Sequence, residues 1–306
     1  MIQETVDVLI VGAGPAGLQA AMHAARKKVS VLVVGRPENS SIASAHVENY
    51  LGVAGVAAGQ DLLAVGLEQA RKFGAELLAE DVLHLGQEGE TFVVRTESRE
   101  VRALSVIIAT GTARKKLKVS GEKELAGRGV SYCVDCDANF YRNARVAVVG
   151  DGSGAVDGAL TLTGYAAEVY LVSRELKVSA ELAGKMAASK VQVMAGTWVK
   201  EISGETAVTG LVLEDGRSVA VEGVFIELGA KGAMELAVNI GVMMDTETFT
   251  HIATDRNQAT NVPGVYAAGD IAGHPYQMAK AVGEGCVAGL EAANYARKKR
   301  QGPVEG

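Results

Sequence analysis

The fold is decided by Val6-Asp7-Val8-Leu9-Ile10-Val11-Gly12-Ala13-Gly14-Pro15-Ala16-Gly17. The apolar first half of this stretch predicts a buried strand, and the glycine-rich second half predicts a tight turn into a helix, Leu18–Arg26. Gly12 permits the turn, Gly14 lets the backbone approach a pyrophosphate, and Gly17 lets the helix pack closely on the strand. Because the first N–H groups of the helix point at this turn, phosphate is favoured there. The stretch therefore predicts a dinucleotide-binding domain.

A second stretch of the same kind lies in the middle of the chain. The predicted strand Arg145–Val149 leads into Gly150-Asp151-Gly152-Ser153-Gly154-Ala155 and then into a predicted helix, Val156–Thr163. In each copy, small β-meander segments precede an apolar strand that ends in glycine, Gly111 in the first copy and Gly229 in the second. The meander segments are 80–84, 91–96 and 101–103 in the first copy, and 191–194, 198–202, 210–214 and 218–221 in the second. Such repetition indicates two versions of one folding plan.

The tail of the chain returns to the first copy. Residues 261–270 predict a turn, a strand and a Gly-Asp pair, and an apolar helix is expected over about 277–297. We therefore expect an α/β fold with two Rossmann-like, three-layer domains, the second inserted into the first. The expected boundaries are 1–113 with 243–306 for the first domain and 114–242 for the second.

Composition narrows the class of protein. The net charge of −6 argues against a nucleic-acid protein, which needs a positive footprint. No apolar run reaches the ~18 residues of a membrane span, and no secretory signal pattern precedes the first strand. The chain has three cysteines, two of them at C-x-x-C spacing, which is not the pattern of a disulfide-stapled secreted scaffold. We expect a cytoplasmic protein in which this pair is redox-active or binds a metal.

The cysteine pair lies in Cys133-Val134-Asp135-Cys136-Asp137, shortly before the second glycine-rich turn. Two thiols at this spacing can form a reducible disulfide, and one of them often has a lowered pKa. A zinc site would need two more ligands at short spacing, but Cys286 is far along the chain and no histidine lies near the pair. We therefore expect no metal. Asp137 is a candidate acid/base for the leaving thiolate, with a loop carboxylate or cap as the alternative.

The second glycine-rich turn carries a mixed signal. Gly150, Gly152 and the small Ala155 still suit a pyrophosphate, but the strand that follows ends in Ser173-Arg174-Glu175. Arg174 suits the 2′-phosphate of NADPH, whereas the neighbouring carboxylate repels it and can instead accept a hydrogen bond from a ribose hydroxyl. The turn therefore predicts either a pyridine-nucleotide site or a site that no longer binds. Two dinucleotide sites flanking a dithiol indicate an electron route from a nucleotide through a flavin to a disulfide.

In these segments the chain resembles the low-molecular-weight thioredoxin reductases nearly end to end. The segments that carry the resemblance are 12–17, 47–50, 108–111, 129–137, 150–155, 261–270 and Gln277. A C-x-x-C inside the second unit is specific to this family. The resemblance implies FAD in the first domain, a pyridine nucleotide in the second, and a redox disulfide that passes electrons to thioredoxin or a similar small dithiol protein. It also implies a homodimer in which the smaller domain swings.

The resemblance also assigns residues. It implies that FAD binds at Gly12, Ala13, Gly14, Pro15, Ala16, Gly17, Asn49, Val82, Ala109, Thr110, Gly111, Gly269, Asp270, Gln277 and Met278. A pyridine nucleotide would bind at Gly150, Gly152, Ser153, Ala155 and Arg174. The catalytic residues would be Cys133, Cys136 and Asp137, with one thiolate attacking the partner's disulfide and the other thiol resolving the mixed disulfide.

Four stretches depart from the family's pattern. The Gly-Gly-Gln stretch is replaced around 39–42, and the Arg-Gln pair of the final helix reads Tyr276-Gln277. The 2′-phosphate motif reads Ser173-Arg174-Glu175 with Ser179 at its last place, and the motif after the second closing strand reads 229–233 without its His, Pro and Asn. A minor branch of the family takes electrons from ferredoxin.

The donor therefore stays open among NADPH, NADH and ferredoxin. The alternative function is a flavin-binding protein or sensor that is not a reductase. An alkyl hydroperoxide reductase flavoprotein is a further alternative, although that family carries an additional N-terminal thioredoxin-like module.

Overall fold

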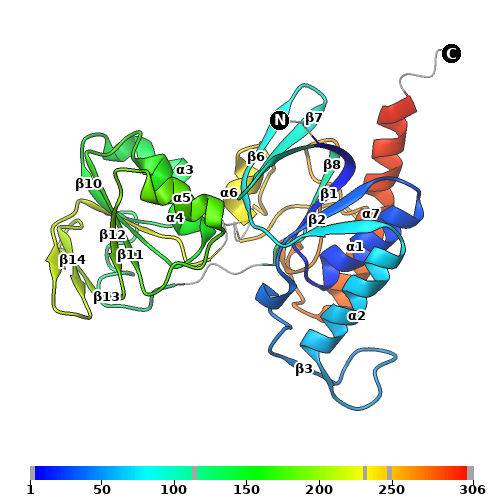
Figure 1. Cartoon of the computed structure of the whole chain (residues 1–306). Helices are drawn as coiled ribbons and strands as arrows, with labels where there is room; N and C mark the ends of the chain where they lie inside the picture. The colour runs from blue at the N-terminus through cyan, green and yellow to red at the C-terminus, as the bar shows by residue number, and fades with distance from the viewer. Residues whose placement is uncertain (1–3, 112–115, 230–232, 247–249, 302–306) are drawn as a thin grey trace. The chain divides into compact units, whose positions relative to one another are not determined.

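The computed structural model describes residues 4–111, 116–229, 233–246 and 250–301. The chain divides into two compact units, Met1–Thr112 with Leu236–Gly306 and Ala113–Glu235 (Figure 1). The first unit is thus built from both ends of the sequence, and the second unit is one continuous stretch. The chain returns to the first unit at Leu236, within the short helix α6 (Ala233–Val238), earlier than the 243 expected from sequence.

The first unit is built on a seven-stranded sheet. The strand order is β5-β2-β1-β8-β7-β6, with β17 also paired to β8. Strands β1, β2, β5, β8 and β17 run parallel to their partners, while β6, β7 and the start of β8 pair antiparallel. Their bounds are β1 (Glu4–Val11), β2 (Val31–Val34), β5 (Ala75–Leu78), β6 (Val82–Glu88), β7 (Thr91–Thr96), β8 (Glu100–Ile108) and β17 (Val265–Ala267).

Strand β8 is longer than the sequence predicted. The segments 101–103 and 106–108 were expected as two strands, one closing the meander and one closing the unit, but they form one continuous strand. Its first half pairs with β7, and its second half pairs with β17. Because β1 pairs with β8 from Val101 to Ile108, the meander belongs to the same sheet as the dinucleotide-binding strands.

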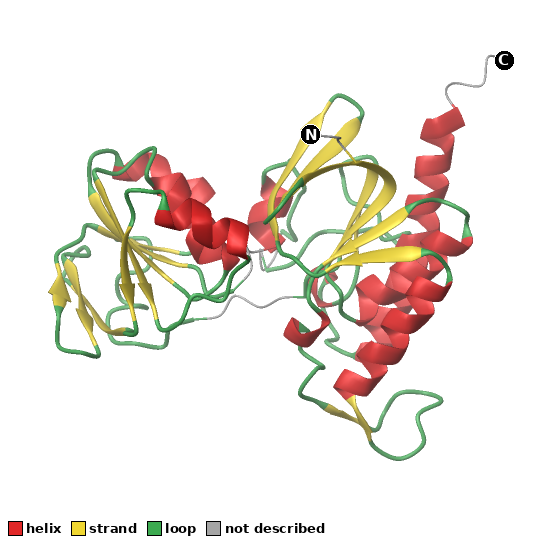
Figure 2. Cartoon of the chain, viewed as in Figure 1, coloured by secondary structure: helices red, strands yellow, loops and turns green. Residues whose placement is uncertain are grey.

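The long helices in the described part of this unit are α1 (Pro15–Arg26), α2 (Gly59–Lys72) and α7 (Met278–Gln301) (Figure 2). Helix α1 begins three residues before the predicted Leu18, because Gly14 is its N-cap and proline is favoured at the first helical position. Helix α7 packs closely on α1 at two glycines. A Cβ at Gly285 or Gly289 would collide with the α1 backbone at Ala16 or Ala20. Small residues therefore set this close helix contact.

The second unit contains a five-stranded parallel sheet with the order β12-β11-β10-β16-β9. The segment expected at 191–194 is one of its strands rather than part of a meander. The sheet strands are β9 (Val130–Ser131), β10 (Arg145–Val149), β11 (Glu168–Ser173), β12 (Gln192–Ala195) and β16 (Gly223–Ile226). The helices of this unit are α3 (Val134–Asp137), α4 (Ser153–Leu162) and α5 (Ala180–Ala187).

A three-stranded antiparallel sheet completes the second unit. It consists of β13 (Val199–Ser203), β14 (Gly210–Leu213) and β15 (Ser218–Val219). The hairpin predicted at Asp215-Gly216 joins β14 to β15, and Gly216 has a φ of +87° as such a turn requires. A two-stranded ribbon of β3 (His46–Val47) and β4 (Ala57–Ala58) lies in the first unit.

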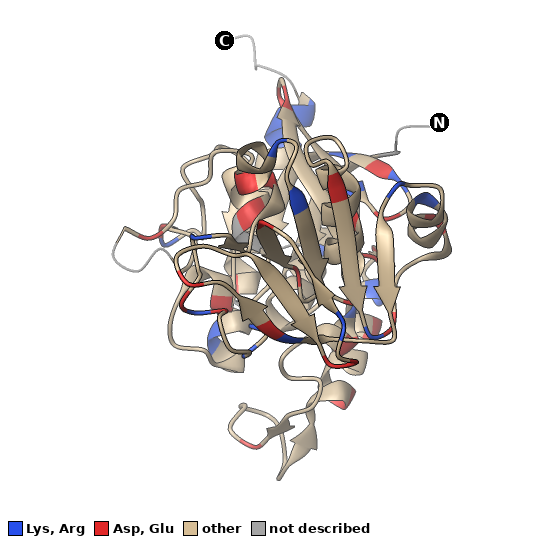
Figure 3. Ribbon diagram, turned by 90° about the vertical axis from the view of Figure 1, so that its left-hand side faces the viewer, with Lys and Arg blue, Asp and Glu red and all other residues tan. Residues whose placement is uncertain are grey.

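Acidic and basic residues are interspersed along the chain (Figure 3). Within the described ranges, no helix combines the length and the apolar character that crossing a membrane requires.

Candidate functional site

The first glycine-rich turn has the backbone geometry that a dinucleotide requires. Gly12 has a φ of +112°, which side chains rarely tolerate, and a Cβ there would collide with the carbonyl of Ala109. A Cβ at Gly17 would likewise collide with the carbonyl of Gly12. Gly14 caps α1 without any side-chain hydrogen bond. The helix start is therefore not covered by a capping side chain, which fits a pyrophosphate seated on its N–H groups.

The Gly269-Asp270 pair follows β17 and is clamped from helix α7. Lys280 Nζ donates to the carbonyl oxygens of Gly269 at 2.8 Å and Gly273 at 2.5 Å, and it pairs with Glu284 at 3.0 Å. Glu284 in turn accepts the N–H of Gly269 at 2.9 Å. Sequence reasoning missed this lysine and glutamate, although their i,i+4 spacing at the start of a helix was a signal.

The same surroundings affect the pKa of the Asp270 carboxyl group. Burial raises the pKa of Asp270, while the nearby Lys280 and His274 act in the opposite direction. The residue sits at the end of a parallel strand, where the predicted ligand of this domain would bind.

The structure brings together two predicted site residues that lie far apart in sequence. Asn49 Nδ2 donates to Gln277 Oε1 at 3.2 Å. Next to them, the rings of His274 and Tyr276 stack with centroids 3.9 Å apart. Tyr276 is the residue that replaces the arginine of the family's Arg-Gln pair. Of the other predicted residues, Val82 is the buried first residue of β6, and Met278 begins α7.

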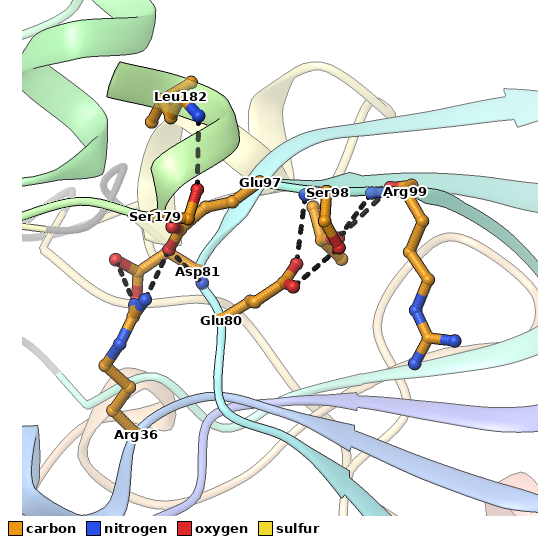
Figure 4. A network of polar contacts seen from close by, with 9 residues as sticks. Arg36, Glu80, Asp81, Glu97, Ser98, Arg99, Ser179 and Leu182 are labelled. Carbon is orange, nitrogen blue, oxygen red and sulfur yellow. Dashed lines mark hydrogen bonds and ion pairs between the residues drawn. The ribbon is translucent and has the colours of Figure 1, made fainter. Parts of the chain in front are cut away.

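An ion-pair network follows strand β2, where a dinucleotide fold often places an acidic residue. Here Arg36 pairs with Asp81 at 2.8 Å and with Glu97 at 2.6 Å, and Glu97 also accepts the N–H of Asp81 at 3.0 Å (Figure 4). Burial opposes the charge of Arg36, but the hydrogen bond to Glu97 and the two carboxylates outweigh it and raise the pKa of Arg36. The sequence analysis did not single out this network, because its members lie on separate strands and turns.

The predicted cysteine pair forms a disulfide at the start of helix α3, with an S–S distance of 2.03 Å. Cys133 is buried and Cys136 is exposed. Cys133 is the N-cap of α3, and its Sγ accepts the N–H of Cys136 at 3.2 Å. The sulfur of Cys133 therefore lies where helix N–H groups stabilise negative charge.

Asp137 ends the same helix and is tied to the disulfide through one hydroxyl group. Ser131 Oγ donates to Asp137 Oδ2 at 2.6 Å and accepts the N–H of Cys133 at 3.1 Å. The carboxylate also affects Tyr141, whose pKa is raised by burial and by the charge of Asp137. The predicted acid/base candidate is thus linked to the backbone of Cys133 through Ser131, a residue that the sequence analysis did not name.

The second glycine-rich turn differs from the first, because its polar groups already have protein partners. The N–H of Gly154 donates to the carbonyl of Gly229 at 3.1 Å. Asp151 Oδ1 accepts both the hydroxyl of Ser173 and the N–H of Arg174 at 2.8 Å. One N–H of the helix start, that of Gly154, and the carboxylate of Asp151 are thus bonded within the unit.

Arg174, the predicted 2′-phosphate ligand, is also engaged. Its guanidinium lies 4.6 Å from the ring centroid of Trp198 and 3.4 Å from Glu214 Oε1. Both partners of the pair are more than half exposed, so the contact with Glu214 is weak in energy. It nevertheless places a carboxylate beside the guanidinium that was predicted to bind the 2′-phosphate of NADPH.

Among the described residues, no group of three or more His, Cys, Asp or Glu side chains is arranged to hold a metal ion. Cys286 is a half-buried thiol in α7 that forms no disulfide.

Comparison with known proteins identifies the class. The family model described as pyridine nucleotide-disulphide oxidoreductase matches residues 6–285. The chain belongs to this family, and within it to the thioredoxin reductases. It is 36% identical to the thioredoxin reductase of Listeria monocytogenes, over 98% of this chain and 96% of the relative, and 35% identical to that of Bacillus subtilis, over 98% and 97%.

Two solved structures extend the comparison. The atypical thioredoxin reductase TRi of Desulfovibrio vulgaris Hildenborough superposes with a TM-score of 0.85 at 34% identity, covering 97% of this chain and 99% of that one. A ferredoxin-flavin thioredoxin reductase of Clostridium acetobutylicum gives 0.69 at 33% identity, covering 95% and 98%. The predicted family and the predicted two-part dinucleotide-binding fold are confirmed.

Proposed function

We propose that this protein is an FAD-dependent thioredoxin reductase whose electrons pass through the Cys133–Cys136 disulfide to thioredoxin or a similar small dithiol protein. The observation that carries the proposal is the disulfide itself, which begins a helix beside Ser131 and Asp137 in the unit that holds the second glycine-rich turn. Replacing either cysteine by serine should leave FAD bound and abolish reduction of thioredoxin. Full activity in both single variants would refute the proposal.

The first unit fits FAD, because a side chain at Gly12 or Gly17 would collide with the backbone and no side chain caps the start of helix α1. The residues proposed to hold the cofactor are Gly12, Ala13, Gly14, Pro15, Ala16, Gly17, Asn49, Val82, Ala109, Thr110, Gly111, Gly269, Asp270, Gln277 and Met278. When bound, FAD would collect electrons from the donor and pass two of them to the disulfide. The residues of the first unit bind and orient it, and the Lys280–Glu284 clamp fixes the turn that carries Asp270.

The partner is reduced by thiol–disulfide exchange. One thiolate of the reduced pair attacks a sulfur of the partner's disulfide, which releases one partner thiolate and forms a mixed disulfide. The second cysteine then attacks the sulfur of the first cysteine in this mixed disulfide. The bond to the partner breaks, the reduced partner is released, and the Cys133–Cys136 bond is restored. Asp137, held by Ser131, is the proposed acid/base for the protons that these sulfurs gain and lose.

We propose a ferredoxin-type carrier, rather than NADPH or NADH, as the electron donor. The hydrogen bond from Gly154 to Gly229 and the two hydrogen bonds to Asp151 support this choice, because they occupy groups that a pyridine nucleotide would need. Gly150, Gly152, Ser153, Ala155 and Arg174 then serve as a structural relic of a nucleotide site. The similarity to a ferredoxin-flavin thioredoxin reductase points the same way.

The donor is tested by mixing the yellow protein anaerobically with NADPH, NADH and reduced ferredoxin in turn and following flavin absorbance. Fast bleaching by ferredoxin alone is the expected result. Fast bleaching by NADPH or NADH would overturn the choice of donor but not the reductase function, which the cysteine variants test separately.

The protein is further proposed to act as a cytoplasmic homodimer. A reducing compartment suits a C-x-x-C pair that must cycle between dithiol and disulfide. Large apolar side chains of the first unit, Leu51 at 98% exposure and Val56 at 61%, offer surface that a second copy could cover. Light scattering after size-exclusion chromatography tests the dimer, and a monomer at micromolar concentration would refute it.

A further inference from the structure

A buried carboxylate contacts the helical turn between the two cysteines. Glu235, in α6, has an exposed fraction of only 3%, and its Oε1 accepts the N–H of Asp135 at 3.3 Å. Asp135 stands between Cys133 and Cys136 in sequence. Glu235 lies a hundred residues further along the chain, so neither the motif nor its spacing could indicate it.

This carboxylate and the sulfur of Cys133 use neighbouring N–H groups of the same helical turn. The N–H of Cys136 points at Cys133 Sγ, at 3.2 Å, and the preceding N–H, of Asp135, points at Glu235. A thiolate on Cys133 would be stabilised by both N–H groups if both were available to it. Glu235 accepts one of them, and when ionised it brings a negative charge to the same helical turn.

We propose that Glu235 is a positioning residue that sets the thiol–disulfide equilibrium of the Cys133–Cys136 pair toward the disulfide. Reduction of the pair adds two electrons and two protons to the sulfurs, and any thiolate that forms in the product is repelled by a nearby carboxylate. The dithiol is thereby made a stronger reductant of its protein partner. The inference rests on the redox role proposed for the pair, and it concerns a residue outside the C-x-x-C motif.

The matched variants are E235Q and E235A. Glutamine keeps the size of the side chain and an oxygen that accepts the Asp135 N–H, but it removes the charge, whereas alanine removes both. The control is E181Q, because Glu181 is an exposed carboxylate of the same unit that pairs with Lys185 at 2.8 Å in the next helical turn.

The measurement is equilibration in glutathione buffers of defined ratio, followed by alkylation of thiols and mass spectrometry of the peptide with both cysteines. We expect E235Q to shift the equilibrium constant about three- to tenfold toward the dithiol, where tenfold corresponds to about 30 mV for a two-electron couple. E181Q should leave it unchanged. An equilibrium constant for E235Q within the error of the parent protein would overturn the proposal.

A second readout guards against loss of packing in the variants. In the C136S background, the rate of alkylation of Cys133 by iodoacetamide at fixed pH reports its thiolate fraction, and E235Q should raise it. An unchanged or lower rate would count against the proposal. Neither readout needs thioredoxin, so a failure of the proposed reductase function would leave these results interpretable, and a failure here would leave that function standing.

Discussion

Ser131 Oγ lies 2.6 Å from Asp137 Oδ2, and the same oxygen accepts the N–H of Cys133 at 3.1 Å. One hydroxyl group therefore joins the candidate acid/base to the first cysteine of the pair. The carboxylate is held by this contact at the end of the short helix on which the disulfide is built, so its position does not depend on the loop that follows.

The first prediction concerns this carboxylate. D137N should lower the turnover of thioredoxin reduction about 100-fold, because general acid–base catalysis is worth that order of magnitude. S131A should have a smaller effect, because it loosens the carboxylate without removing it. Turnover is measured with saturating donor, and FAD content serves as the control for folding. Full activity of D137N would show that the proton comes from elsewhere.

The second prediction concerns which cysteine attacks the partner. The greater exposure of Cys136 favours it as the attacking residue. The helix N–H that is bonded to the sulfur of Cys133 instead favours Cys133 as the thiolate. We expect C136S to form a stable mixed disulfide with thioredoxin through Cys133, and C133S to form little. Non-reducing electrophoresis and mass spectrometry detect the adduct. The reverse pattern would mean that access, rather than thiolate stabilisation, decides the order.

The third prediction concerns the clamp from α7 on the Gly269-Asp270 turn. K280M should weaken FAD binding roughly tenfold, equivalent to about 1.4 kcal/mol, because it removes the bonds to two carbonyl groups and to Glu284. The matched control is K298M, an exposed lysine on the same helix. Titration of the apoprotein with FAD gives the dissociation constants. Equal affinities of the two variants for FAD would show that Lys280 does not contribute to FAD binding.

The fourth prediction concerns the ion pairs of Arg36. R36M should destabilise the protein by about 3 kcal/mol, because it removes the guanidinium from a fully buried carboxylate, Glu97, and from Asp81. Adding E97Q should recover part of the loss. Thermal unfolding of the FAD-loaded protein measures both effects. A double variant no more stable than R36M would indicate that Asp81, rather than Glu97, carries the cost.

Local patterns in the sequence predicted the parts of the fold that depend on local order. The strand-turn-helix around Gly12 and the hairpin at Asp215-Gly216 are each encoded by a few adjacent residues, and both are present. The same reasoning split β8, because the apolar pattern is interrupted at Ser105, where the partner changes from β7 to β17. It also assigned β12 to a meander, because an isolated short strand does not reveal the direction of its partner.

The candidate site was predictable to the same degree. The cysteines and Asp137 belong to one motif, and the structure places them together. Contacts between distant segments were not predictable. They include Arg36 with Glu97, Lys280 with the Gly269 turn, and the carbonyl of Gly229 on the N–H of Gly154. The last of these decides how the second turn is interpreted, and only the folded chain shows it.

The divided first unit has a consequence for the order in which the chain acquires its structure during synthesis. The second unit is complete once residue 235 has been made, whereas the first still lacks strand β17 beside β8 and helix α7 on α1. Until these arrive, the small-residue face of α1 is exposed to water, and the last half of β8 has an open edge. The unit whose synthesis begins first is therefore the last to be completed. Its partly synthesised form is the state most exposed to aggregation and to chaperones.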